Sequence, residues 1–184
     1  MRTTGVVLAM LATIYAGSVG FAGEIVQQIS PFASYQNTED MDNGIGGGLK
    51  YVVTYGEVIP HLDAGLDVRA SWLMFDGDDN DYRADLDMVP IELTFLAQYE
   101  VFAGCKPYLG VGVGYYIFDS DEIDIDDDLG CYGIVGWNQK VLEHLSVFAE
   151  AKYLLLEPDV NGGASTADID LSGVGANVGI AVDF

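Results

Sequence analysis

The chain has 184 residues, half of them apolar, and its 29 Asp and Glu against 7 Lys and Arg give a formal net charge of −22. This length suits one domain, and the apolar content argues against disorder. So large an acidic excess argues against nucleic acid as a partner, because phosphate binding needs clustered basic residues. Beyond the N-terminus, no run of about 18 apolar residues lacks a charge, so any membrane span must be built from strands.

The N-terminal residues have the features of an export signal. Arg2 supplies a positive charge, Gly5 to Val19 is an uncharged apolar run, and Ala22 fits a cleavage site. A retained single-span anchor is the alternative, but the run is short and no basic cluster follows it. We therefore expect a signal peptide over residues 1–22 and a mature domain over residues 23–184.

The rest of the chain alternates between apolar and polar residues with a period of two. In LDAGLDVRASWLM, which starts at Leu62, every second residue is apolar, and no helix keeps two such sets on separate faces. A tilted strand needs about 9 to 11 residues to span a bilayer, which matches these segments. Eight strands are expected, over residues 26–36, 45–55, 62–74, 89–101, 109–117, 129–139, 145–155 and 174–184. Only the segment 129–139 has an ambiguous face assignment.

The connections between these strands alternate in length and chemistry. Three short ones are expected around residues 56–58, 102–104 and 142–143. Four longer ones, over residues 37–44, 76–84, 119–128 and 157–170, hold 18 of the 29 acidic residues. Short turns at one rim and long loops at the other are typical of an outer-membrane barrel. Eight strands place both chain ends at the short-turn rim and every long acidic loop at the extracellular rim.

Aromatic residues are expected in two girdles, since Trp and Tyr prefer the membrane interfaces. The strand directions place four of them toward the short-turn rim and three toward the long-loop rim. The first group is Tyr55, Tyr99, Trp137 and Phe184, and the second is Trp72, Tyr115 and Tyr153.

The polar faces of the strands are rich in glycine and in opposite charges. An eight-stranded barrel is only just wide enough for its interior side chains, so a wide pore is not expected, and the glycines relieve crowding. The charges favour an interior network of pairs over a gated ion path, because a buried charge left alone is costly. The expected network consists of Lys50, Asp67, Arg69, Glu92, Glu150 and Lys152.

Several segments in this order resemble small outer-membrane β-barrels of the outer membrane protein A-like or porin-like family. They are GLKYVVTYG, LGVGVGYY, LSVFAEAKY and the closing GVGANVGIAVDF. The resemblance covers residues 23–184 and implies a closed antiparallel up-and-down barrel in the bacterial outer membrane, in contact with its lipid and lipopolysaccharide. It also implies an assembly signal that the barrel assembly machinery reads in the last strand, at Val178, Ile180, Val182 and Phe184.

Catalysis is not expected. Some small outer-membrane barrels are lipid A acyltransferases or deacylases, whose chemistry needs a His near a Ser at the outer rim. Here the two histidines, His61 and His144, both fall near the short turns. Ser146 is close to His144 in sequence, but this pair lies at the wrong end for outer-leaflet lipid.

The acidic loops place carboxylates at alternate positions, which suits weak Ca²⁺ or Mg²⁺ binding. The candidate ligands are Asp76, Asp78, Asn80, Asp124, Asp126 and Asp128. Neither run completes an EF-hand, so a solvated acidic rim without a resident metal is the favoured interpretation, and no cofactor is expected.

The two cysteines are expected to remain free thiols. Cys105 begins the fifth strand near the short-turn rim, whereas Cys131 begins the sixth near the opposite rim. A disulfide needs Cα atoms within about 7 Å, and most of the barrel height separates these positions.

The sequence thus favours a non-enzymatic outer-membrane barrel with a structural role or a surface-interaction role through its acidic loops, toward an unknown extracellular ligand. One alternative is a small cation-preferring porin or channel. A second is a soluble periplasmic lipocalin-like barrel with an apolar ligand in its cup.

Overall fold

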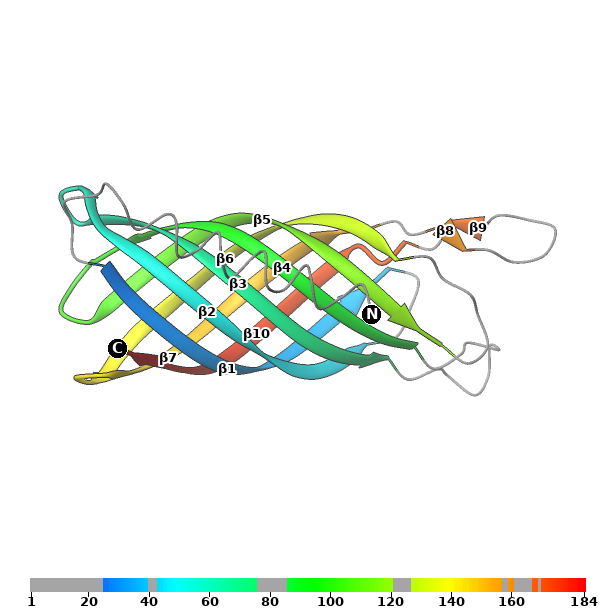
Figure 1. The fold of residues 1–184 in the computed structure, drawn as a ribbon, viewed down its shortest axis with the longest axis horizontal. Coiled ribbons are helices and arrows are strands. Elements are labelled where there is room, and N and C mark those ends of the chain that lie inside the picture. Colours follow the sequence, from blue (N-terminus) through cyan, green and yellow to red (C-terminus); the bar gives the residue numbers. More distant parts are fainter. Residues whose placement is uncertain are drawn as a thin grey trace.

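The computed structural model describes residues 25–39, 43–75, 86–120, 127–156, 159–160, 167–168 and 170–184. They form a closed barrel of eight antiparallel strands, in the neighbour order β1-β10-β7-β6-β5-β4-β3-β2 (Figure 1). The barrel strands are β1 (Ile25–Thr38), β2 (Gly44–Ile59), β3 (Leu62–Phe75), β4 (Leu86–Tyr99), β5 (Cys105–Asp119), β6 (Asp128–Leu142), β7 (Leu145–Leu155) and β10 (Gly173–Asp183). Within this part of the chain, no helix is long and apolar enough to cross a membrane.

The expected alternation of short and long connections is confirmed (Figure 1). The first short turn is placed differently, however: β2 continues to Ile59 through an irregularity after Tyr55, and the chain reverses at Pro60 and His61. His61 has a φ of 68°, in the left-handed region that lets two residues close this hairpin. The fourth long connection also contains a pairing that the sequence did not predict, between β8 (Asp159–Val160) and β9 (Ala167–Asp168).

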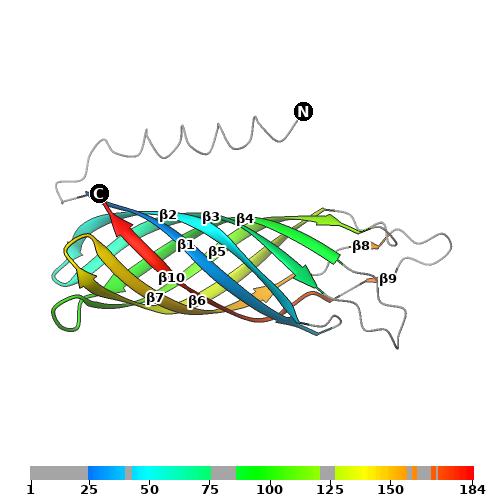
Figure 2. The ribbon, with the colours of Figure 1, turned by 90° about the horizontal axis from the view of Figure 1, so that it is seen from below.

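The first and last strands close the barrel. β1 and β10 lie side by side and pair from Gln28 with Asp183 to Thr38 with Gly173 (Figure 2). The chain end at Phe184 therefore lies at the short-turn rim, as expected. This closure removes the unpaired strand edges, as lipid requires of any sheet that spans it.

The apolar faces of the strands point outward. Leu49, Phe95 and Val111, on three different strands, are each at least 50% exposed in the isolated chain. On β6, Leu129 and Val135 are exposed and Tyr132 is buried. The lipid-facing side of this strand, which was ambiguous in the sequence, is therefore the one that carries Leu129 and Val135. Six of the seven girdle aromatics are exposed on the outer surface, namely Tyr99, Trp137, Phe184, Trp72, Tyr115 and Tyr153, and Tyr55 is half-buried.

Both cysteines are free, as expected. Cys105 pairs with Gln139 in the ladder near the short-turn rim, whereas Cys131 pairs with Val113 and Leu155 toward the other rim. Cys105 is buried and Cys131 faces outward.

Interior glycines make room for aromatic rings from neighbouring strands. A Cβ added at Gly112 would lie 2.6 Å from Oη of Tyr132 and 2.7 Å from the carbonyl oxygen of Leu93. The Tyr132 hydroxyl lies 2.7 Å from Oγ1 of Thr94, which holds the ring in place. The inward ring and the glycine opposite it therefore fill one space in the lumen.

We expect Gly112→Ala to lower the free energy of unfolding by about 1 to 3 kcal/mol, because the Tyr132 ring must move. Gly133→Ala is the matched control: its Cβ would meet only the Gly110 carbonyl oxygen, at 3.9 Å, and it lies on the outward face. Urea titration of the refolded barrel in lipid vesicles measures both. Equal losses would show that the interior ring is not packed as described.

Candidate functional site

The six predicted interior charges lie inside the barrel, midway between the rims. All are buried: Lys50, Glu150 and Lys152 are 5% exposed, Arg69 and Glu92 2%, and Asp67 1%. They comprise three cations and three anions. The interior therefore carries no net charge at its middle.

One ion pair crosses the full width of the lumen. Arg69 on β3 contacts Glu150 on β7, and these strands are four steps apart around the barrel in either direction. The Arg69 guanidinium also contacts Asp67 on its own strand. Because the pair joins opposite walls, its side chains lie where a solute would have to pass.

Glu150 accepts several further contacts inside the barrel. Nζ of Lys50 lies 3.2 Å from Oε2 of Glu150, which also accepts a 2.8 Å hydrogen bond from the Tyr108 hydroxyl. Nδ2 of Asn177 donates to Oε1 of Glu150 at 2.7 Å. Each of these donors satisfies an oxygen that burial would otherwise leave unpaired.

A second pair spans the lumen nearer the long-connection rim. Nζ of Lys152 on β7 lies 2.8 Å from Oε1 of Glu92 on β4, and the Tyr116 hydroxyl donates to the same oxygen at 2.7 Å. The Lys152 ammonium also lies 5.3 Å from the centre of the Tyr132 ring. These contacts stabilise a charge pair that is nearly free of water.

An apolar cluster, which the sequence did not predict, extends from the side chains beside this network toward the long-connection rim. Its buried members are Leu73, Phe75, Leu86, Met88, Tyr108, Tyr116, Tyr132, Ile134, Leu154, Leu156 and Leu171. Leu154 and Tyr116 have no exposed surface. Apolar side chains therefore pack inside the barrel toward its long-connection mouth.

Two members of this apolar cluster come from a connection rather than from a strand. Leu156 follows β7 and Leu171 precedes β10, and the Leu171 amide donates to the Leu156 carbonyl at 2.9 Å. Hydrogen bonds from the Ser172 hydroxyl and, at 2.8 Å, from the Ser172 amide hold the pKa of Asp170 below its ordinary value. These bonds fix the base of the fourth long connection over the mouth.

The candidate cation ligands fall largely outside the described residues: Asp76, Asp78, Asn80, Asp124 and Asp126. Asp128 is described, and its carboxylate accepts a 2.7 Å hydrogen bond from the Leu129 amide. No group of three or more His, Cys, Asp or Glu side chains in the described ranges is arranged to hold a metal ion. The expected signal peptide, residues 1–22, also lies outside them.

The remaining candidates lie where the topology predicts. His61 and His144 occupy short turns, and Ser146 lies on the inner face of β7 just beyond His144. The last strand presents Val178, Ile180, Val182 and Phe184 on the outer surface, each at least 40% exposed.

Comparison with known proteins agrees with this architecture. The model of the outer membrane protein beta-barrel domain family matches residues 6–184. An uncharacterised outer-membrane protein, y4mB, of Sinorhizobium fredii (strain NBRC 101917 / NGR234) is 32% identical over 79 residues, or 39% of this chain. That match spans 34% of the length of y4mB.

Solved structures share the fold at low identity. OprG of Pseudomonas aeruginosa has a TM-score of 0.61 and 17% identity, covering 90% of this chain and 98% of OprG. Neisserial surface protein A has a TM-score of 0.56 and 13% identity, covering 87% and 97% of the two chains. Ail, the attachment invasion locus protein of Yersinia pestis, was solved with the heparin analogue sucrose octasulfate; it has a TM-score of 0.54 and 16% identity, covering 88% and 99%.

These findings agree with the outward apolar faces, and the alternative of a soluble barrel with an apolar cup is therefore wrong. The chain belongs to the outer membrane protein beta-barrel domain family, and it is a protein of the bacterial outer membrane that spans the lipid with eight strands.

Proposed function

We propose that this protein is a non-conducting barrel that anchors four acidic connections at the cell surface for interaction with a partner. One observation carries the proposal: the Arg69 to Glu150 ion pair crosses the diameter of the lumen, and the apolar cluster lies beyond it. A barrel so filled serves as a rigid support. The placement of the long connections outside the cell follows the usual layout of outer-membrane barrels.

The charge of the connections indicates the class of partner. The segments 37–44, 76–84, 119–128 and 157–170 contain 18 acidic residues and a single basic residue, Arg83. Ail, of the same fold, was solved with a sulfated polyanion. The carboxylates of these connections would repel such a polyanion, so we infer a partner that presents basic groups, or divalent cations that bridge these carboxylates to lipopolysaccharide.

No residue is assigned a catalytic role. We further propose that Val178, Ile180, Val182 and Phe184 are read by the barrel assembly machinery, because they form an outward apolar row along the strand that closes the barrel against β1.

Planar-bilayer recordings test the closed lumen. We expect the purified wild-type barrel to insert without stable conductance steps, because ion pairs and apolar side chains fill its interior. Reproducible cation-selective steps would instead support the alternative of a small channel. Heat-dependent gel mobility of the same sample serves as the control that a folded barrel was tested.

Binding of a fluorescent octalysine peptide to proteoliposomes tests the acidic connections. Replacing the seven carboxylates of residues 119–128 with amides should weaken binding at least about tenfold at low salt, and added salt should weaken binding to the wild type. Glu143→Gln is the control, since Glu143 is an exposed carboxylate in a short turn at the other rim. Unchanged binding after neutralisation would contradict the proposed role of the connections.

A further inference from the structure

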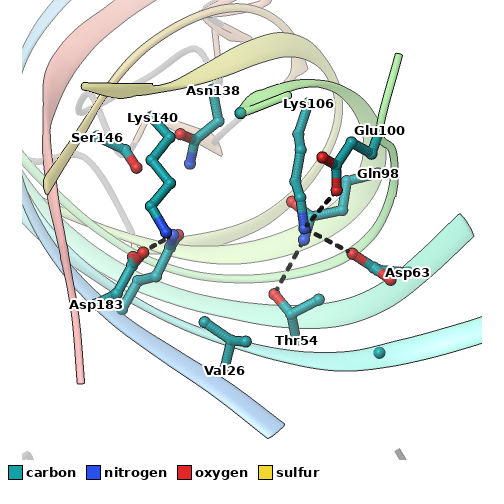
Figure 3. Close-up of a pocket in the computed structure, with 13 residues that line it drawn as sticks. Val26, Thr54, Asp63, Gln98, Glu100, Lys106, Asn138, Lys140, Ser146 and Asp183 are labelled. Carbon is teal, nitrogen blue, oxygen red and sulfur yellow. Dashed lines mark hydrogen bonds and ion pairs between the residues drawn. The ribbon is translucent and has the colours of Figure 1, made fainter. Parts of the chain in front are cut away.

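The lumen opens at the short-turn rim into a polar cavity of ≈ 240 Å³ (Figure 3). Side chains or backbone from all eight barrel strands line it. Farther in, the buried cluster of Phe32, Phe148 and Ala181 lies on the short-turn side of the charge network. The Lys50 ammonium of that network lies 3.5 Å from the centre of the Phe148 ring. Buried side chains of this cluster and of the charge network therefore lie inward of the cavity, which we call the vestibule.

One side of this vestibule has an excess of negative charge. Nζ of Lys106 lies 3.0 Å from Oδ2 of Asp63 and 3.9 Å from Oε2 of Glu100, so two carboxylates share one ammonium (Figure 3). The Glu100 side chain is 44% exposed, whereas that of Asp63 is 13% exposed. Glu100 thus offers oxygens to a cationic group that enters the vestibule.

The other side presents a cation. Lys140 on β6 projects into the cavity away from Lys106 (Figure 3). Among the described residues, no carboxylate oxygen lies within 4.0 Å of its ammonium, although Lys106 has two such partners. The nearby Asp183 carboxylate accepts a 2.6 Å hydrogen bond from Nε2 of Gln28. The Lys140 ammonium, which makes no ion pair with Asp183 or another described carboxylate, can therefore contact an anionic group that enters the cavity.

Neutral hydrogen-bonding groups line the space between the two charged sides. Gln98 and Asn138 contribute amides, and Thr54 and Ser146 contribute hydroxyls. Such groups donate to carbonyl oxygens and accept from N–H groups, which are what a peptide backbone presents.

We propose that the vestibule binds a short zwitterionic peptide, with its amino end at Glu100 and Asp63 and its carboxylate at Lys140. Three carboxylates against two ammonium groups disfavour a purely anionic ligand. An apolar ligand would remove water from these charges without replacing its hydrogen bonds. A volume somewhat below that of typical drug-binding pockets suits two or three small residues.

Isothermal titration of the full chain, refolded in detergent, with trialanine tests the proposal. Trialanine should bind with a Kd in about the mM range, and acetylation of its amino end or amidation of its carboxyl end should each weaken binding about fivefold or more. The requirement for both ends selects a free short peptide over the terminus of a larger protein, which presents only one end. Binding that survives acetylation, or no binding up to about 50 mM, overturns the proposal.

Variants of the vestibule locate the site. Lys140→Gln and Glu100→Gln should each weaken trialanine binding about fivefold, because each removes one charged contact at a partly exposed position. Glu143→Gln removes a carboxylate at the same rim that does not line the cavity and should leave the affinity unchanged. Heat-dependent gel mobility verifies that each variant is folded. Equal affinity for the wild type and Lys140→Gln would place the peptide elsewhere and overturn the assignment.

Discussion

Replacement of Arg69 by methionine should lower the free energy of unfolding by about 3 to 5 kcal/mol, the range for breaking a buried ion pair by removing one partner. The loss arises because Asp67 and Glu150 keep their charges in an interior that excludes water. Lys50 can still contact Glu150, but Asp67 loses the cation that binds it. Urea titration in lipid vesicles, followed by the fluorescence of Trp72 and Trp137, measures the change.

Lys106→Met is the matched control for this experiment. Lys106 also pairs with carboxylates inside the barrel, but at the open vestibule, where its side chain is 33% exposed. Solvent screening limits such a pair to about 1 kcal/mol or less. If both variants lost equally little stability, Arg69 would have to be hydrated in the folded barrel, contrary to its burial in the structure.

The second large effect is expected at the apolar cluster. Leu154→Ala should lower the free energy of unfolding by about 3 to 5 kcal/mol, because the substitution removes buried methyl groups and leaves a cavity that rigid strands cannot close. Leu154 has no exposed surface and contacts only the interior of the barrel. The same urea titration measures the loss.

Leu155→Ala tests whether the effect comes from the interior. Leu155 is the next residue on β7 and lies on the outer face, where it is 51% exposed in the isolated chain. Its substitution loses transfer free energy of at most about 2 kcal/mol, because lipid fills the space left behind. A loss at Leu155 equal to or larger than that at Leu154 would contradict a packed interior at this rim.

Much of this fold could be predicted because a strand that spans lipid has a strict period of two. Leu62 to Ser71 shows the pattern at full contrast, with outward leucines and alanines against Asp67 and Arg69. The prediction failed to describe the lumen near the long connections, where Leu73 and Phe75 point inward while Trp72 and Met74 point outward. Once both faces are apolar, alternation carries no signal about what fills the interior.

The ion-pair partners within the candidate site could not be predicted from the sequence, for a different reason. That Lys50, Arg69 and Lys152 should have acidic partners follows from the cost of a buried charge. Which partner each takes depends on the register of all eight strands, since Arg69 and Glu150 are 81 residues apart. The vestibule could not be predicted for the same reason, because each strand contributes only one or two of its lining residues.

The amino-acid sequence by itself determined the number of strands, the face that meets lipid, the alternation of short turns with long acidic connections, and the free state of both cysteines. These features depend on spacing along the chain and on the chemistry of neighbouring residues. The tertiary structure alone decided that opposite walls join through Arg69 and Glu150, that Leu156 and Leu171 turn inward over one mouth, and that Lys106 and Lys140 face the other. Those features depend on the closure and stagger of the barrel, which set the distances across the lumen between residues that are remote in sequence.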